Sequence, residues 1–101
     1  MQPAKADFKL SPLEKKVYAA VLSIPLGEVR SYAWLARRAG KPRQSRQIGQ
    51  ILKRNPFLFL VPCHRIIKSN GELGGYVLGV KVKKGLLDLE KKVRKCLLSK
   101  E

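Results

Sequence analysis

Cys63 is followed directly by His64, the only histidine of the chain, and this pair has the side chains best suited to nucleophilic chemistry. A thiol with its ordinary pKa of about 8.5 is mostly protonated at neutral pH, and it becomes a nucleophile when a base or a positive charge favours the thiolate. His64 is a candidate for that base, and Arg65 adds positive charge. Because neighbouring side chains of an extended segment point to opposite faces, His64 needs a turn or a bridging water molecule to reach the sulfur.

A carboxylate normally orients the histidine beside such a nucleophile, and the sequence offers three candidates. Glu90 is preferred, and Asp88 and Glu72 remain as alternatives. Cys63 also follows an apolar run, so a buried core cysteine is the competing interpretation. With one further cysteine, Cys96, and no second histidine, the pattern predicts no metal site. Cys96 itself is expected to be structural.

The charge of the chain is strongly unbalanced, with 22 Lys and Arg against 7 Asp and Glu among 101 residues, a formal charge of +15. A hydrophobic content of 45% excludes a disordered polycation, and the length fits one domain. The segment from Val29 to Gly71 contains no acidic residue, and its bases are Arg30, Arg37, Arg38, Lys41, Arg43, Arg46, Lys53, Arg54, Arg65 and Lys68. This asymmetry predicts a nucleic-acid partner, with a membrane surface or ribosomal RNA as alternatives.

Other protein classes do not fit the sequence. No apolar run approaches the about 18 residues of a membrane span, and the N-terminus has no signal-peptide pattern. Two cysteines are too few for a disulfide scaffold. The sequence therefore predicts a cytoplasmic or nucleoid-associated protein, or a nuclear one in a eukaryote, with no membrane partner.

The N-terminal half predicts a short arm over residues 1–10 and then helices of a domain over 11–101. Ser11, Pro12 and Glu14 form a helix start with a capping box. The apolar face of this first helix would consist of Leu13, Val17, Ala20, Val21 and Ile24, and Pro25 and Gly27 would end it. A second helix is expected from Ser31 to Ala39 with Gly40 as its terminator, and a third from about Gln44 to Arg54, stopped by Asn55-Pro56.

The second and third predicted helices, joined by a tight turn, resemble a helix-turn-helix motif, whose second helix usually enters a DNA groove. The outward positions expected to meet DNA are Arg43, Ser45, Arg46, Gln47, Gly49, Gln50 and Lys53. An ordinary helical hairpin with a basic outer face is the alternative. Trp34 is assigned to helix packing rather than to base stacking.

The C-terminal half predicts the segment that carries the cysteine and a final helix. Phe57 to Val61 is expected to be a buried extended segment, and Asn70-Gly71 is the strongest hairpin dipeptide. The final helix would run from about Lys81 to Leu98, with Val82, Leu86, Leu89, Val93 and Leu97 facing the core. The expected fold is mainly α: a small helical domain with a helix-turn-helix and a short extended segment or hairpin that carries Cys63.

Several spaced motifs resemble the O6-alkylguanine-DNA alkyltransferase family. Residues 62–67, Pro-Cys-His-Arg-Ile-Ile, are similar to its active-site signature, and residues 27–32, Gly-Glu-Val-Arg-Ser-Tyr, to an upstream segment. Residues 46–49 with Asn55-Pro56 resemble its recognition helix and the hinge that follows. Its C-terminal part is matched by Gly71, Gly74, Tyr76, Gly79, Leu86, Leu87 and Glu90, so the likeness covers about residues 10 to 92.

The resemblance implies a suicidal repair reaction on double-stranded DNA that contains O6-alkylguanine. The family flips the alkylated guanine out of the duplex. A cysteine then takes the alkyl group irreversibly, one group per protein, and no cofactor is needed because the sulfur is the acceptor. The family binds through the minor groove, and a monomer is expected.

Roles for individual residues follow from the same resemblance. Cys63 matches the acceptor, His64 the base that acts through water, and Glu90 the carboxylate that orients it. Asn55 matches the residue that holds the active-site turn. Tyr32 matches the tyrosine that helps to rotate the nucleotide and donates a hydrogen bond to the base.

The resemblance also assigns the residues around the flipped base. Arg46 matches the arginine that fills the gap left in the duplex. The backbone carbonyls of Val61 and Cys63 would read the guanine amino group. Tyr76 and Val77 lie on the loop that walls the pocket, and Leu52 completes the predicted pocket.

The sequence departs from the family pattern in three respects. Family members usually carry an additional N-terminal domain, which this sequence is expected to lack. Gln47 and Gln50 are bulkier than the residues common on the recognition helix, and Val77-Leu78 replaces a more polar or smaller pair. Alkyltransferase-like proteins bind alkylated DNA without repairing it and have another residue in place of the cysteine. Cys63 therefore favours an active acceptor, with a lesion sensor or a plain helix-turn-helix module as alternatives.

Overall fold

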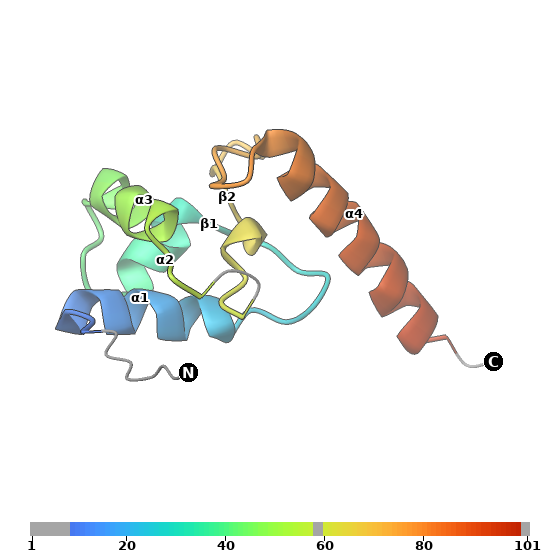
Figure 1. Ribbon diagram of the computed structural model, residues 1–101, viewed down its shortest axis with the longest axis horizontal. Coiled ribbons are helices and arrows are strands. Elements are labelled where there is room, and N and C mark those ends of the chain that lie inside the picture. Colours follow the sequence, from blue (N-terminus) through green and yellow to red (C-terminus); the bar gives the residue numbers. More distant parts are fainter. Residues whose placement is uncertain (1–8, 58–59, 100–101) are drawn as a thin grey trace, which may run out of the picture.

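The computed structural model describes residues 9–57 and 60–99, so the predicted arm lies almost wholly outside the described residues. The elements are α1 (Pro12–Leu22), β1 (Arg30–Ser31), α2 (Tyr32–Arg38), α3 (Ser45–Lys53), the 3-10 turn η1 (Cys63–Arg65), β2 (Ile66–Ile67) and α4 (Val80–Leu97). Figure 1 shows α1, α2 and α3 grouped together, with α4 extending away from them. The predicted fold class, a small and mainly helical domain, is confirmed.

Helix α1 begins with the predicted capping box. The Ser11 Oγ accepts from the Glu14 backbone N–H at 3.1 Å, and the Glu14 carboxylate accepts from the Ser11 N–H at 2.8 Å. Pro12 occupies the first turn, where its missing N–H costs no helical hydrogen bond. The predicted apolar face is buried at Val17 and Val21, and α1 thereby forms the floor of the core.

The α2 and α3 helices pack against each other and against α1, as a helix-turn-helix within a three-helix core does. Ser31 caps α2 by accepting from the Trp34 N–H at 3.0 Å. Gly40 follows α2 with a φ of +79°, a left-handed conformation that glycine adopts without strain. The inner faces bury Leu35, Ala36, Ile48, Ile51 and Leu52, and these side chains fix the angle at which α3 is presented.

A two-stranded parallel sheet joins the helical core to the segment that carries the cysteine. Arg30 pairs with Ile66 and Ser31 with Ile67. The predicted hairpin at Asn70-Gly71 is therefore only partly right. A turn does form there, closed by the Lys68 N–H donating to the Glu72 carbonyl at 2.8 Å, but β2 takes its partner from β1 instead of from the residues after the turn.

The prediction of a buried extended segment over Phe57–Val61 is only partly right, and Leu58 and Phe59 lie outside the described residues. Val61 is buried and forms a β-bridge, but Phe57 and Leu60 belong to a turn. The N–H groups of Leu60 and Val61 both donate to the Phe57 carbonyl, at 3.0 and 2.9 Å, so the chain turns back on itself. The cause is Asn55, whose side chain accepts from the Phe57 N–H and donates to the Val61 carbonyl. Leu60 is left 76% exposed at the outside of the turn.

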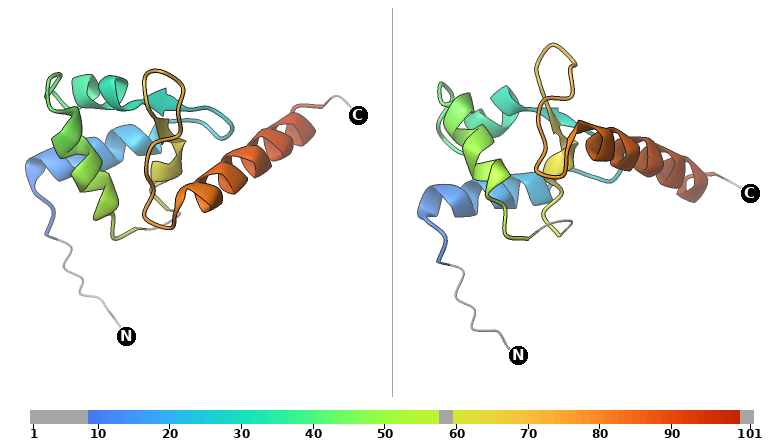
Figure 2. Two further views of the ribbon diagram at one scale, coloured as in Figure 1. Left: turned by 90° about the horizontal axis from the view of Figure 1, so that it is seen from above. Right: turned by 45° about the horizontal axis from the view of Figure 1, so that its top comes forward.

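The inner face of α4 also differs from the prediction. Val82, Leu89, Val93 and Leu97 are exposed and Leu86 is half-buried, whereas Lys83 and Leu87 are buried. The helix is rotated so that Lys83, Leu87, Glu90 and Arg94 face the body of the protein, because the polar ends of these side chains have specific partners there. Figure 2 shows in both views that most of α4 stands clear of the other helices.

The capping box of α1 predicts a measurable loss of stability on removal. Ser11→Ala should lower the free energy of unfolding by about 1 kcal/mol, because the Glu14 N–H loses its acceptor. Chemical denaturation followed by circular dichroism measures this value. Ser45→Ala is the matched control, since Ser45 begins α3 without a side-chain cap. Equal losses in both variants would contradict the assigned role of Ser11.

Candidate active site

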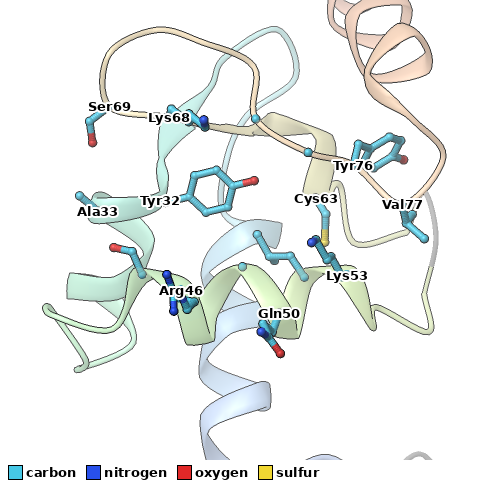
Figure 3. A pocket seen from close by; sticks show the side chains of 15 residues that line it. Tyr32, Ala33, Arg46, Gln50, Lys53, Cys63, Lys68, Ser69, Tyr76 and Val77 are labelled. Atoms are coloured by element: carbon cyan, nitrogen blue, oxygen red, sulfur yellow. The ribbon is translucent and has the colours of Figure 1, made fainter.

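A cavity of about 840 Å³ lies between α3, the start of α2 and the loop that leads from β2 to α4. Figure 3 shows Tyr32, Arg46, Gln50 and Cys63 around it. Its lining residues are Tyr32, Ala33, Ser45, Arg46, Gly49, Gln50, Leu52, Lys53, Cys63, Lys68, Ser69, Gly74, Gly75, Tyr76 and Val77. The volume is sufficient for a nucleobase, and a helix with basic side chains forms one wall.

Cys63 is held at the inner end of this cavity by Asn55. The Asn55 side-chain amide donates to the Cys63 Sγ and to the Val61 carbonyl, both at 3.0 Å. Asn55 is buried directly after α3, so this amide ties the end of α3 to the turn before the cysteine. Cys63 is only 7% exposed. It begins η1, and a turn at this point is one of the two ways in which the adjacent His64 could reach the sulfur.

Burial dominates the ionisation of this thiol. It raises the pKa of Cys63 to about 12, although the hydrogen bond from Asn55 and the positive charge of Lys83 act in the opposite direction. The expectation that the basic surroundings favour a thiolate therefore needs correction for the unliganded protein, because desolvation outweighs the nearby charge. The resting side chain is a neutral thiol at neutral pH, and a reaction at sulfur needs a group that takes its proton.

His64 and Glu90 form a buried pair behind the cysteine. The His64 Nε2 lies 2.6 Å from the Glu90 Oε2, and both side chains are largely enclosed. The other two candidate carboxylates lie elsewhere: Asp88 pairs with Lys84 at 3.0 Å, and Glu72 faces Lys68 at 3.7 Å. Of the three carboxylates considered, the one in contact with His64 is Glu90.

Arg65 fixes the Glu90 carboxylate from its other side. Its Nε and Nη2 donate to the two Glu90 oxygens at 2.8 and 3.0 Å, and its Nη1 donates to the Ile24 carbonyl at 2.8 Å. Burial by itself would raise the pKa of Glu90, but the hydrogen bonds from Arg65 and His64 and their charges outweigh it and lower that pKa. Glu90 is thus a carboxylate at neutral pH and accepts from His64.

This pairing decides which ring nitrogen of His64 is available as a base. A carboxylate can only accept, so the proton of a neutral His64 lies on Nε2 and the lone pair on Nδ1. The Nδ1 atom is buried and has no hydrogen-bond partner among the described residues. Buried polar atoms without partners are uncommon, and this one belongs to the residue next to the thiol.

Lys83 is a site residue that the sequence patterns did not reveal. Its side chain is fully buried and its Nζ donates to the carbonyls of Leu73 and Gly75, to the latter at 3.1 Å. The ammonium also lies 5.8 Å from the centre of the Tyr32 ring. Burial lowers its pKa to about 8, while Cys63 acts to raise it. One signal was available: Lys83 precedes Glu90 by two helical turns and so shares its face.

Tyr32 occupies the cavity wall between the two parts of the fold. It begins α2, and its ring lies against Gly49 of α3 and Gly74 of the loop. A Cβ on Gly74 would lie 3.2 Å from the Tyr32 hydroxyl oxygen, and Gly74 has a φ of +73°. Glycine at this position therefore lets the loop approach the phenol closely. Burial raises the pKa of Tyr32, so its hydroxyl keeps the proton and remains a hydrogen-bond donor.

The remaining predicted residues fall into three groups. Ser45, Arg46, Gly49, Gln50 and Lys53 line the cavity along α3, as do Leu52, Tyr76 and Val77. Arg43 and Gln47 border a second hollow of about 580 Å³ on the outer face of α3 together with Gln44, Arg46, Gln50 and Arg54. Val61 is buried and is not among the residues that line the cavity. The cavity residues that sequence reasoning missed are Ala33, Lys68, Ser69, Gly74 and Gly75.

Two absences hold for the described part of the chain. No three His, Cys, Asp or Glu side chains of residues 9–57 and 60–99 come together as metal ligands. In the same residues, no helix combines the length and the apolar character needed to cross a membrane.

The two cysteines should differ in reactivity because only Cys96 is exposed. At neutral pH iodoacetamide should modify Cys96 much faster than Cys63, and the Cys63 rate should increase about tenfold for each pH unit, as the thiolate fraction does below a raised pKa. Mass spectrometry of the two cysteine peptides measures both rates. A Cys63 rate equal to that of Cys96, or one independent of pH, would refute the neutral buried thiol.

Comparison with known proteins places this geometry in a family. The family described as "6-O-methylguanine DNA methyltransferase, DNA binding domain" matches residues 12–92. The methylated-DNA–protein-cysteine methyltransferase of Methanosarcina acetivorans is 44% identical over 88 residues, which are 83% of this chain and 56% of that protein. The protein of the same name from Mycobacterium tuberculosis is 41% identical over 85 residues. The chain spans about half the length of these curated relatives.

Solved structures agree with the sequence comparison. The structure of Mycobacterium tuberculosis OGT in complex with DNA matches with a TM-score of 0.81 and 41% identity, over 85% of this chain and 53% of that one. Schizosaccharomyces pombe Atl1, solved with damaged DNA containing O6-carboxymethylguanine, matches with a TM-score of 0.71 and 34% identity, over 82% of this chain and 79% of that one. On its sequence and its fold, this chain belongs to the 6-O-methylguanine DNA methyltransferase family, and the match covers the DNA-binding domain of that family.

Proposed function

We propose that this protein repairs alkylated guanine in double-stranded DNA by transferring the O6-alkyl group to Cys63, once per molecule. The observation that carries the proposal is the position of Cys63, a thiol at the inner end of a cavity walled by a basic recognition helix, with His64 and Glu90 behind it. DNA binding is a property of related proteins solved as DNA complexes. We propose the same DNA binding for this chain, together with alkyl transfer to its own cysteine.

The proposed reaction is an in-line displacement at the alkyl carbon. The thiol proton leaves for the His64 Nδ1, directly or through a water molecule, and Glu90 stabilises the imidazolium that results. A bond forms between the Cys63 sulfur and the alkyl carbon while the bond from that carbon to O6 breaks. The electron pair of the broken bond stays with guanine, which takes up one proton and is restored. The thioether is stable, so the protein is consumed and no cofactor takes part.

Activation of the thiol is the main energetic requirement, because the resting pKa of Cys63 is about 12. Asn55 donates to the sulfur at 3.0 Å and stabilises a developing thiolate. The positive charge of Lys83 acts in the same direction, and it stays protonated at neutral pH because its pKa is about 8. Transfer of the thiol proton to the His64 Nδ1 then completes the activation of the sulfur.

Entry of the base rests on the helix-turn-helix. A guanine inside a duplex cannot reach a buried sulfur, so the nucleotide must rotate out of the stack. Arg46 lies exposed on α3 at the cavity mouth and is positioned to fill the gap in the duplex. Tyr32, a neutral phenol in the cavity wall, would donate a hydrogen bond to the base. We assign α3 to the minor groove of DNA, which suits base flipping without strong sequence preference. We expect the protein to act as a monomer, in the cytoplasm or nucleoid, or in the nucleus of a eukaryote.

A lesion sensor is the second candidate function, because Atl1, solved with damaged DNA containing O6-carboxymethylguanine, matches this chain with a TM-score of 0.71 and 34% identity. A sensor binds the alkylated base and leaves it unchanged. The feature that separates the two functions is a reactive group at the inner end of the cavity, and here that group is the Cys63 thiol held by Asn55.

The acceptor role predicts a covalent product. Incubation with duplex DNA containing O6-methylguanine should add one methyl group to the peptide that bears Cys63, with one group per protein at completion. Mass spectrometry of the digested protein measures the site and the stoichiometry. Cys63→Ala should abolish transfer and retain binding of the modified duplex. Tight binding by the wild-type protein with no gain in mass would instead establish the lesion sensor.

Lys83 predicts a loss of rate without a matching loss of binding. Lys83→Met removes the charge near Cys63 and the donor that holds the carbonyls of Leu73 and Gly75. Single-turnover transfer should slow by about 10- to 100-fold, the range of a lost charge stabilisation, while duplex affinity changes little. In the wild type, deprotonation of Lys83 near pH 8 removes its positive charge and should lower the transfer rate. The rate of Lys83→Met should lack this decrease. Equal effects on affinity and rate, with an unchanged pH profile, would show a purely structural lysine.

A further inference from the structure

One side of α4 carries a row of exposed lysines that the proposed reaction does not use. The row consists of Lys81, Lys84, Lys91, Lys92 and Lys95. The exposed acidic residue of α4 is Asp88, which pairs with Lys84 at 3.0 Å. With 3.6 residues per turn, these six positions occupy about a third of the helix circumference. No apolar residue of α4 falls in this sector, which we call the lysine face.

The face that holds α4 to the body of the protein is a different one. Lys83 and Leu87 are buried there, and the Glu90 carboxylate is hydrogen-bonded inside the protein. By helical spacing, the centre of the lysine face lies about a third of a turn from this inner face. Figures 1 and 2 show that beyond its first turns α4 extends away from α1, α2 and α3. The lysine face is therefore open to another molecule while α4 keeps its own contacts.

The C-terminal half of the lysine face borders a hollow of about 310 Å³. The hollow is lined by Gly27, Lys91, Arg94, Lys95 and Leu98. Gly27 has a φ of +83°, and a Cβ there would lie 2.5 Å from the Arg94 Cδ, so glycine lets the arginine lie against this turn. Neither Lys91 nor Lys95 has an ion-pair partner among residues 9–57 and 60–99. The hollow is thus a concave place where positive charge is available to an anion.

One carboxylate lies near the hollow, and it is already compensated. The Glu28 Oε2 lies 3.5 Å from the Arg94 guanidinium, and its Oε1 accepts from Arg30 at 2.8 Å. Two arginines therefore share this one carboxylate, and the two lysines of the hollow remain uncompensated.

Stabilisation of the helix dipole does not account for the lysine face. Bases near a helix C-terminus do stabilise its carbonyl end, and Lys95 lies in the last turn of α4. This effect falls off within one turn. Lys81 and Lys84 lie at the opposite end of α4, where positive charge opposes the dipole. A bound polyanion explains the whole row, because it balances the charge at both ends.

The class of ligand follows from the lack of apolar side chains on the lysine face. The core of a protein interface and a helix that inserts into a membrane surface both need apolar contacts. Nucleic-acid phosphates are bound through charge alone. Lys84 and Lys95 are separated by about 16 Å along the helix axis, a length over which one DNA strand presents about five phosphates. A DNA backbone thus matches the face in both charge and length.

The lysine face is separate from the surface that we assign to the first duplex. No residue of α4 lines the cavity beside α3 or the hollow on the outer face of α3. In the views of Figures 1 and 2, α3 and the C-terminal end of α4 lie at opposite sides of the molecule. A duplex seated on α3 therefore leaves the far half of the lysine face free for other DNA.

We propose that the lysine face of α4 binds the phosphate backbone of a second DNA segment, with one phosphate in the hollow beside Gly27, while α3 holds the first segment. The protein then bridges two duplexes. The proposal rests on DNA binding by α3, as in the proposed function, but not on alkyl transfer. The family match ends at residue 92, so Arg94 and Lys95 lie beyond it.

A bridging assay with unmodified DNA tests the second surface without any need for alkyl transfer. A short biotinylated duplex is held on streptavidin beads, the protein is added below saturation, and a fluorescein-labelled duplex is then offered. The wild-type protein should retain the labelled duplex, and retention should fall as salt is added. Protein bound to the beads without retention of the second duplex overturns this proposal alone. Absence of protein from the beads would contradict DNA binding itself and with it both proposals.

Charge-matched variants locate the second segment. Lys91→Gln combined with Lys95→Gln should lower retention about tenfold or more and reduce the slope of its logarithmic salt dependence by about two, because two phosphate contacts are lost. Lys15→Gln combined with Lys16→Gln removes the same charge from exposed positions of α1 and should leave retention unchanged. Lys91→Arg combined with Lys95→Arg keeps the charge and should keep retention. Equal losses in the two glutamine pairs, or a loss in the arginine pair, overturn the proposal.

Anisotropy with a single short duplex separates a second segment from a longer contact with the first. The affinity of the Lys91→Gln, Lys95→Gln variant for this duplex should change little, because neither residue lines the cavity. A loss of affinity as large as the loss of retention would place both lysines on the same duplex as α3 and overturn the proposal. Circular dichroism should show the same helix content in this variant as in the wild type.

Sedimentation distinguishes the other possible occupants. Without DNA the protein should sediment as a monomer, since a dimer would bridge two duplexes through its two α3 helices and overturn the proposal. Vesicles that contain phosphatidylserine supply the last arm. Binding to these vesicles that the Lys91→Gln, Lys95→Gln variant abolishes, together with no retention of the second duplex, would show a lipid surface as the partner and overturn the proposal.

Discussion

The carboxylate of Glu90 joins the parts of this molecule that the backbone leaves separate. It binds Arg65 through two hydrogen bonds and His64 through one, and Arg65 reaches back to the Ile24 carbonyl after α1. The orientation of α4, the tautomer of His64 and the position of η1 all follow from this one buried group. Because removal of one partner from a buried charged cluster leaves the others uncompensated, these residues form a unit that tolerates little change.

Desolvation and charge act against each other at the cysteine. Burial of Cys63 keeps the thiol neutral and protects it, while Asn55 and Lys83 supply stabilisation that counts only once negative charge develops on sulfur. In the proposed reaction Cys63 reacts once only, so it must not be spent on small electrophiles in solution. The arrangement matches that requirement, because the sulfur is slow until a base fills the cavity and its proton has an acceptor.

Features with local causes were predictable from the sequence. The capping box at Ser11, the end of α2 at Gly40 and the apolar faces of the first three helices depend on residues close together in the chain. The resemblance to the family placed Cys63, His64 and Glu90 together. Residue spacing alone left three carboxylates open as the partner of His64. The rotation of α4 was not predictable from periodicity, because it is set by the hydrogen bonds of Glu90 to His64 and Arg65, far earlier in the chain. The burial of Lys83 and the course of the turn after Asn55 depend on side-chain hydrogen bonds to backbone carbonyls, which a pattern of apolar residues does not register. Hydrophobic periodicity assigned α4 the wrong inner face, since its inward positions are mainly polar.

The parallel pairing of β1 with β2 has a consequence for how the molecule assembles. Arg30 and Ile66 enclose the whole helix-turn-helix between them, whereas the contacts of α2 with α1 and with α3 close shorter loops. Closing the longer loop costs more chain entropy and is repaid only when the helices are already in place. The three-helix core should therefore form first, and the nucleophile should reach its final position late in folding. A partly folded chain would present the proposed DNA-binding surface before the proposed reaction centre is complete.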